Sequence, residues 1–156
     1  MSDCRICALH AELELLPPRE RIHLDEHWRV GHGWGSLEGW LVVCARRHVE
    51  SIDRLDPAAL ASLSPLLAAA GGALREVVGC ERTYVVSFGE KPGFHHLHIH
   101  IVPRMASFTD AQAGVGVFGF LQVPETEMVS AERRDRLAEQ LRPRIGAGLL
   151  PGGHPR

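Results

Sequence analysis

The chain of 156 residues lacks the features that define several special classes of protein. No uninterrupted apolar run approaches the roughly 20 residues that span a bilayer. The first residues, MSDCRICALHAELE, are polar and acidic, unlike a secretory signal. The sequence also contains no internal repeat and no low-complexity linker. We therefore expect a cytoplasmic protein with no membrane partner.

The chain also lacks an excess of charge of one sign. Its 17 basic and 19 acidic side chains give a formal net charge of −2, so bulk charge gives no reason to expect a nucleic acid polymer as a partner. A local basic site for a phosphate is still compatible with this balance. With 45% hydrophobic residues, a chain of this length can bury a core as one domain. We expect a single domain over residues 1–145 and a flexible tail, rich in glycine and proline, over residues 146–156.

Cysteine is scarce, with four residues in the chain, and in the cytoplasm these would not form disulfides. Cys44 and Cys80 stand alone in apolar surroundings, as buried free thiols do. Cys4 and Cys7 form a CxxC with no room for a strand before it, which favours metal binding over a thioredoxin-like redox role. Two cysteines supply only half of a zinc site, so metal-free thiols remain an alternative.

The first half of the chain predicts two strands followed by a long helix. Residues 27–49 contain two β-rich runs joined by a Gly/Ser turn. Asp56 followed by Pro57 is typical of a helix N-cap and first helical position. Apolar residues then recur at helical spacing until Gly79, which we expect to end the helix.

The second half predicts two further strands and a C-terminal helix. Residues 82–88 and 96–102 have strand character, and a last helix begins at Ser130 and ends before Pro143. Residues 105–129 contain GVGVFGFL, for which a strand, a lid and a dimer contact all remain open. The order of elements indicates an α+β domain with a mostly antiparallel sheet, one long helix and a C-terminal helix.

The most informative motif is FHHLHIHIVPR at residues 94–104, which holds four of the ten histidines. In a strand, alternation places His96, His98 and His100 on one face and the apolar residues between them in the core. A three-histidine metal site fits this row poorly, because residues four apart on a strand lie roughly 13 Å apart. A row of imidazoles suits a phosphate ligand, and neutral imidazole is a nucleophile near pH 7. A polar barrel lining is the main structural alternative.

The stretch HLHIHIV at residues 96–102 matches the alternating His/apolar signature of the histidine triad superfamily, and residues 20–104 resemble that superfamily more broadly. The resemblance implies an α+β domain that pairs as a homodimer and acts at the α-phosphate of a nucleotide. It implies that His98 attacks phosphorus and carries the nucleotide covalently, while His100 contacts the phosphate without a catalytic metal. Substrates in the superfamily include nucleoside phosphoramidates, dinucleoside polyphosphates and adenylylated compounds.

Some branches of that superfamily, including the galactose-1-phosphate uridylyltransferases, hold a structural zinc. Their ligands are a CxxC, a histidine after the second strand and the first triad histidine. The resemblance therefore implies a zinc site of Cys4, Cys7, His48 and His96, a complete tetrahedral set. His48 as a plain surface residue is the alternative.

Departures from the family pattern concern the approach to the triad, where many members carry Asn, then Gln and Ser or Thr. Here Ser87 stands near the Asn position and Gly93 replaces the hydroxyl residue, which puts phosphoramidate chemistry in doubt. We expect Ser87, Lys91, Gly93 and Arg104 to bind substrate. Lys91 as a solvated turn residue and Arg104 in a dimer salt bridge are alternatives. Two competing hypotheses are a nucleotide-binding or scaffold protein with little turnover and a metallohydrolase with zinc at the triad.

Overall fold

The computed structural model describes residues 3–152, and in this part of the chain the strands form one antiparallel sheet. The sheet order is β1-β2-β3-β5-β4. The strands are β1 His23–Leu24, β2 Trp28–His32, β3 Leu41–Ala45, β4 Arg82–Val86 and β5 His98–Arg104. The α+β prediction is confirmed, and the short β1 is an addition to it.

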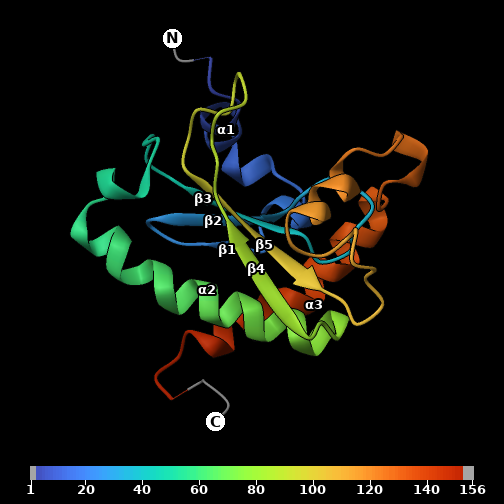
Figure 1. Cartoon of the computed structure of the whole chain (residues 1–156). Helices are drawn as coiled ribbons and strands as arrows, with labels where there is room; N and C mark the ends of the chain where they lie inside the picture. The colour runs from blue at the N-terminus through green and yellow to red at the C-terminus, as the bar shows by residue number, and fades with distance from the viewer. Residues whose placement is uncertain (1–2, 153–156) are drawn as a thin grey trace.

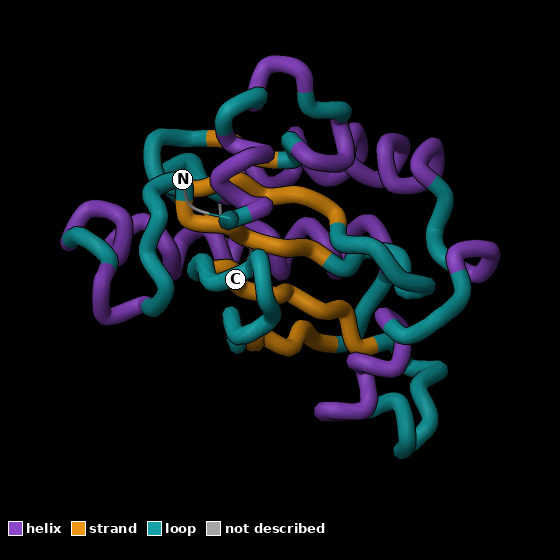
Figure 2. Tube along the Cα trace, turned by 90° about the horizontal axis from the view of Figure 1, so that it is seen from above, coloured by secondary structure: helices purple, strands orange, loops and turns teal. Residues whose placement is uncertain are grey.

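Two long helices, α2 Pro57–Val78 and α3 Ala131–Gly148, lie against one face of the sheet (Figure 1). In Figure 2 the strands lie side by side across these helices. The short helix α1, Arg5–His10, lies beside the β4–β5 loop, where the amide of Arg5 donates to the carbonyl of Gly93 at 2.9 Å. Short 3₁₀ segments connect the rest: Leu13–Leu15, Pro18–Glu20, Ile52–Arg54, Gly114–Leu121 and Glu125–Glu127.

Helix α2 has the ends that the sequence predicts. The Asp56 side chain accepts from the amide of Ala59 at 2.8 Å, and Gly79 adopts a left-handed conformation with φ of 72°. By length and composition alone α2 is apolar enough to cross a membrane, with mean hydropathy 1.4, which the sequence analysis did not anticipate. Its buried residues pack in the main core with the sheet and α3, as expected of a core helix.

Helix α3 begins where predicted, because Ser130 caps it through the amide of Arg133 at 3.2 Å. The predicted end before Pro143 is wrong, since α3 runs through it to Gly148 and into the segment expected to be a tail. A proline inside a helix costs about 3 kcal/mol or more. Burial of an apolar side chain contributes about 1.5–3 kcal/mol. Buried residues on both sides of Pro143 therefore offset the cost: Leu137, Ala138, Leu141 and Ile145.

The sheet has one face in the main core and one open face. On β5, Ile99 and Ile101 belong to the main core, so His98 and His100 project from the open face. The undecided segment at 105–129 forms no strand. Its 3₁₀ helix, Gly114–Leu121, packs over the open face, where Val117 joins a second apolar cluster.

Candidate active site

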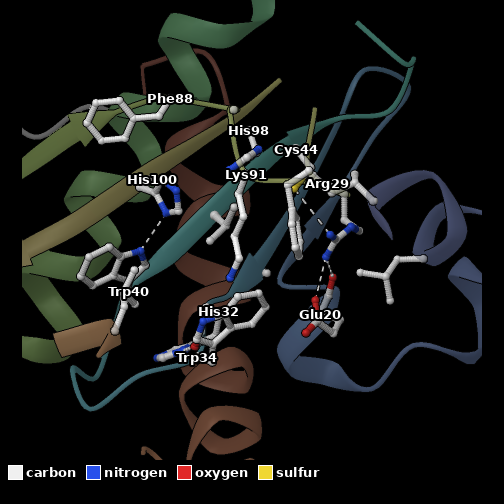
Figure 3. Close-up of a pocket in the computed structure, with 18 of the residues that line it drawn as sticks. Glu20, Arg29, His32, Trp34, Trp40, Cys44, Phe88, Lys91, His98 and His100 are labelled. Atoms are coloured by element: carbon white, nitrogen blue, oxygen red, sulfur yellow. Dashed lines mark hydrogen bonds and ion pairs between the residues drawn. The ribbon is translucent and has the colours of Figure 1, made fainter. Parts of the chain in front are cut away.

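A cavity of about 450 Å³ lies on the open face of the sheet (Figure 3). Residues paired directly across strands share a face, so two rows that cross β2, β3 and β5 form its floor. The rows are Arg29–Cys44–His98 and Gly31–Val42–His100. Burial raises the pKa of the Cys44 thiol to about 11, so this floor residue stays protonated and is not a nucleophile.

His98 presents a free ring nitrogen to the cavity. Its Nδ1 lies 2.7 Å from the backbone carbonyl oxygen of His96, and a carbonyl can only accept, so Nδ1 carries the proton. The other nitrogen, Nε2, then holds a lone pair. A side chain with this tautomer and a fixed ring is arranged as a nucleophile.

His100 has the opposite tautomer. The indole nitrogen of Trp40 donates to Nδ1 of His100 at 3.0 Å, and an indole N–H can only donate. The ring proton of His100 therefore resides on Nε2. Burial, with a smaller contribution from the charge of His98, lowers the pKa of His100 to about 4, which keeps the ring neutral. The two rings lie 5.2 Å apart between centroids, so a lone pair and a donor stand next to each other.

Further polar and aromatic side chains surround this pair. Lys91, on the β4–β5 loop, extends into the cavity (Figure 3), with its ammonium 5.8 Å from the centre of the Phe94 ring. Trp34 is 51% exposed and meets the Phe94 ring edge-on at 6.0 Å. The cavity thus combines a cationic group with aromatic surface that can pack against a flat ring.

Three of the predicted substrate-binding residues lie outside the described lining of the cavity. Ser87 is turned away, because its hydroxyl donates to the carbonyl of His98 at 2.6 Å. Gly93 packs against the Arg5 side chain. Arg104 forms an ion pair with Glu81 at the far end of β5. Among the four residues predicted to contact substrate, the structure places Lys91 in the lining of the cavity and Ser87, Gly93 and Arg104 outside that lining.

His96 does not join the row predicted for it. β5 begins at His98, so His96 precedes the strand and is fully buried. Its Nε2 lies 2.6 Å from the carbonyl oxygen of Ala45 and must carry the proton, which leaves the Nδ1 lone pair facing Cys4 and Cys7. The histidine triad therefore separates into a catalytic candidate pair and a third ring in another environment.

Cys4, Cys7, His48 and His96 form a cluster that can hold a metal ion. Their ligand atoms all lie within 4.8 Å of one another. The Sγ of Cys7 is 3.3 Å from Nδ1 of His48, and the two sulfurs are 3.4 and 3.5 Å from Nδ1 of His96. Tetrahedral zinc with bonds of about 2.0–2.3 Å separates its ligand atoms by roughly 3.5 Å, so the donor set and its spacing fit that metal.

Sequence reasoning missed a polar group at the other end of the cavity. Figure 3 shows Glu20 and Arg29 together on the side opposite His98 and His100. The Arg29 guanidinium is buried, with Nη1 at 2.9 Å from Glu20 Oε2. A signal was available, because alternation along β2 puts an arginine next to Gly31 on the face away from Trp28. The contribution of Trp40 had no such signal, since Trp40 lies before β3.

Sequence comparison and structural comparison give different results. No model of a protein family and no curated protein matches the sequence. A hypothetical histidine triad nucleotide-binding protein from Sulfolobus tokodaii strain 7 is similar in structure, with TM-score 0.67, 19% identity, and 92% of each chain covered. A Zn-bound histidine triad family protein from Mycobacterium smegmatis gives TM-score 0.64 and 17% identity, covering 92% of this chain and 93% of that chain.

A histidine triad protein from Bradyrhizobium japonicum gives TM-score 0.64 and 22% identity, covering 80% of this chain and 89% of that chain. The chain therefore has the fold of the histidine triad proteins, as the sequence motif predicted.

Proposed function

We propose that the chain is a histidine triad enzyme, a nucleotide hydrolase or nucleotidyl transferase that cleaves at the α-phosphate. The observation that carries this proposal is the pair of complementary tautomers in one cavity: His98 offers a lone pair and His100 offers an N–H. A phosphoryl group needs both, a nucleophile in line with the leaving group and a donor to a non-bridging oxygen.

The reaction runs in two displacements. Nε2 of His98 forms a bond to the α-phosphorus while the bond from that phosphorus to the bridging atom breaks, and the leaving group departs with the electron pair. The His98 ring becomes cationic, and its Nδ1–H bond to the His96 carbonyl stabilises that charge. Water or another acceptor then attacks phosphorus, loses its proton and releases the nucleotide, which restores neutral His98.

His100 and Lys91 stabilise the charge that develops on the phosphoryl oxygens. His100 donates from Nε2 without needing to be charged, and Lys91 supplies a positive charge at the same cavity. Because Gly93 stands where the superfamily carries a hydroxyl residue, and Ser87 donates to the His98 carbonyl, neither position offers a hydroxyl to protonate a leaving amine. A phosphate leaving group requires no such proton, so we favour phosphoric anhydride bonds over phosphoramidate bonds.

The missing side-chain donors on the approach to the triad, Gly93 in place of a hydroxyl residue among them, favour a second candidate, a nucleotide-binding protein with little turnover. The two functions share the cavity and differ in whether the covalent step completes. A panel of dinucleoside polyphosphates and nucleoside phosphoramidates separates them, since the second candidate binds members of the panel without releasing product.

We further propose that Cys4, Cys7, His48 and His96 hold a structural zinc. The support is the spacing of the four donor atoms and the lone pair that His96 directs at the sulfurs. When bound, zinc would crosslink the N-terminal segment to the residue two before His98, outside the reaction itself.

A cytoplasmic homodimer is also part of the proposal. β4 is an edge strand of the sheet, and Val85 on it and Phe88 after it are 52% and 63% exposed. An exposed apolar sheet edge favours association with a second copy. Sedimentation equilibrium that reports a monomer at micromolar concentration would contradict the dimer.

The test of the enzyme proposal is turnover by paired histidine variants. His98→Ala is expected to lower kcat by at least about a thousandfold with little change in nucleotide affinity, because the nucleophile is lost and the cavity remains. His95→Ala is the matched control, since His95 is exposed and belongs to the same histidine-rich run without lining the cavity. Equal turnover in the two variants would contradict the role of His98.

A further inference from the structure

The Glu20–Arg29 pair gives the cavity a second polar end that the proposed reaction does not use. Arg29 is 3% exposed, and its Nη1 donates to both Oε2 and the backbone carbonyl of Glu20 at 2.9 Å. Its Nη2 lies 3.5 Å from the Cys44 sulfur. A buried guanidinium held at three points fixes the Glu20 carboxylate in turn. Oε2 accepts one bond from Arg29 and keeps a second lone pair, so Oε1 and Oε2 can together accept from a ligand.

Gly31 makes room for this ion pair on the floor of the cavity. A Cβ at that position would lie 2.9 Å from Nη1 of Arg29 and 3.0 Å from Oε2 of Glu20, closer than such atoms approach. Both Glu20 and Gly31 line the cavity. The absence of a side chain at Gly31 therefore leaves the space that the Glu20–Arg29 pair occupies beside the cavity.

The distance across the sheet decides which part of a nucleotide arrives there. Arg29 and His98 are paired to opposite sides of Cys44, so two strand spacings, about 10 Å, separate them. A ribose adjoins its own 5′-phosphate, whereas the far edge of the base lies beyond the ribose. With the α-phosphate at His98, the base edge is the part of the ligand that extends to Glu20.

The walls between the two ends suit a flat ring. Ile6, Leu9, Trp34 and Phe94 line the cavity with apolar and aromatic surface. All bases stack on such surfaces, because each has a flat π-face, so the walls can hold any base without selecting one. Selection then depends on the polar group at the end, the Glu20 carboxylate.

An ionised carboxylate only accepts hydrogen bonds, so it selects a base edge that carries donors. Guanine presents two adjacent donors, N1–H and the N2 amine, that match one carboxylate. Adenine presents one amine beside the acceptor N1, which a carboxylate repels. We propose that Glu20, held in position by Arg29, makes the site selective for guanosine nucleotides. The proposal rests on the proposed function, since the α-phosphate is placed at His98.

Binding of GMP, IMP and AMP to the full chain, measured by calorimetry, tests the proposal. GMP is expected to bind about tenfold to a hundredfold more tightly than AMP, the range for one good bidentate contact to a base. IMP, which keeps N1–H and lacks the amine, is expected to fall between them. Glu20→Gln replaces an acceptor with an amide donor and is expected to bring GMP and AMP within about twofold.

Two variants complete the test. Glu90→Gln is the matched control, because Glu90 is an exposed carboxylate of the same cavity on the β4–β5 loop, and it is expected to keep the preference for GMP. If Glu20→Gln does not fold, Gly31→Ala tests the same contact, since its methyl group displaces the pair without removing a charge. Equal affinity of the wild-type chain for GMP and AMP, or a preference for GMP that survives Glu20→Gln or Gly31→Ala, overturns the guanine assignment. Failure of all three nucleotides to bind overturns the proposed function and the assignment with it.

Discussion

Two neighbouring imidazoles on β5 acquire different roles from the groups that meet their Nδ1 atoms. The Nδ1 of His98 faces a backbone carbonyl, and the Nδ1 of His100 faces the indole N–H of Trp40. A carbonyl oxygen can only accept, so the Nδ1 atom that faces it must carry a proton. An indole N–H can only donate, so the Nδ1 atom that faces it must hold a lone pair. Because the two rings share a cavity, their remaining nitrogens present one lone pair and one donor to the same ligand.

At this residue scale, Trp40→Phe tests the origin of the His100 tautomer. The change keeps an aromatic ring and removes the donor, so the free energy of unfolding is expected to fall by about 1 kcal/mol. Neutral His100 loses a stabilising partner, so its pKa is expected to rise from about 4 toward its ordinary value. Titration of the His100 ring followed by NMR measures this rise.

Trp34→Phe is the control for that shift. Trp34 lines the same cavity, is half exposed and makes no hydrogen bond to His100. A His100 pKa that stays at the wild-type value in Trp40→Phe, or moves equally in both variants, would contradict a role of the Trp40 indole in keeping His100 neutral.

At the scale of elements, helix α1 is too short to be stable alone. It has six residues, whereas isolated helices shorter than about 12–15 residues are marginal in water. Its N-cap is Cys4, whose sulfur accepts from the amide of Cys7 at 3.4 Å. The same cysteines contribute to the candidate metal cluster, so a bound ion would attach the helix to His96.

Cys4→Ser distinguishes the role of Cys4 as a metal ligand from its role as the N-cap of α1, because serine is a good N-cap residue and a poor zinc ligand. We expect zinc content to fall from one ion per chain to near zero, and Tm to fall by several degrees. Elemental analysis and calorimetry measure both. Cys80→Ser, which changes a buried thiol outside the cluster, should keep its zinc. One zinc per chain in Cys4→Ser would contradict the assigned ligands.

The elements also show what the sequence could predict. Helix α2 was predicted correctly at both ends, because Asp56, Pro57 and Gly79 act locally. Pro143 failed as a stop signal, because packing against the core outweighs the local cost. The prediction that His96 shares a face with His98 and His100 was wrong for a different reason. Alternation holds only within a strand, and β5 begins two residues after His96.

At the scale of the whole molecule, the site depends on register. His98 was a candidate from the sequence alone, but its row with Arg29 depends on which residues of β3 pair with β2 and β5. Pairing between β3 and β5, whose partner residues lie 54 to 60 positions apart, follows from the packing of the entire sheet, which local patterns do not encode. The histidine end of the cavity could therefore be predicted from the sequence, whereas the position of Glu20 at the other end could be recognised only from the folded structure.

The stability of the whole molecule should depend on pH through its buried histidines. Burial lowers the pKa of His32, like that of His100, to about 4. His32 is fixed in a neutral form, because it donates to the Gly33 carbonyl and accepts from the amide of Gly39. Both rings bind protons in the unfolded chain near their ordinary pKa of 6.5 while the folded rings stay neutral.

Stability is therefore expected to fall as pH decreases from about 6.5 to about 4, with no contribution from these two groups above that window. Urea unfolding across the window and above it measures the slope. His32→Gln should reduce the slope, and His95→Ala should leave it unchanged. A slope that is the same in all three proteins would contradict the neutral state of His32.

The proposed reaction depends on a covalent bond between His98 and the α-phosphorus of a nucleotide. Rapid quenching without acid, followed by mass spectrometry of the peptide that contains His98, tests it most directly. We expect an added nucleoside monophosphate group on His98 during turnover of a nucleoside polyphosphate, and no adduct in His98→Ala. Turnover without any adduct, or an adduct on another residue, would contradict it.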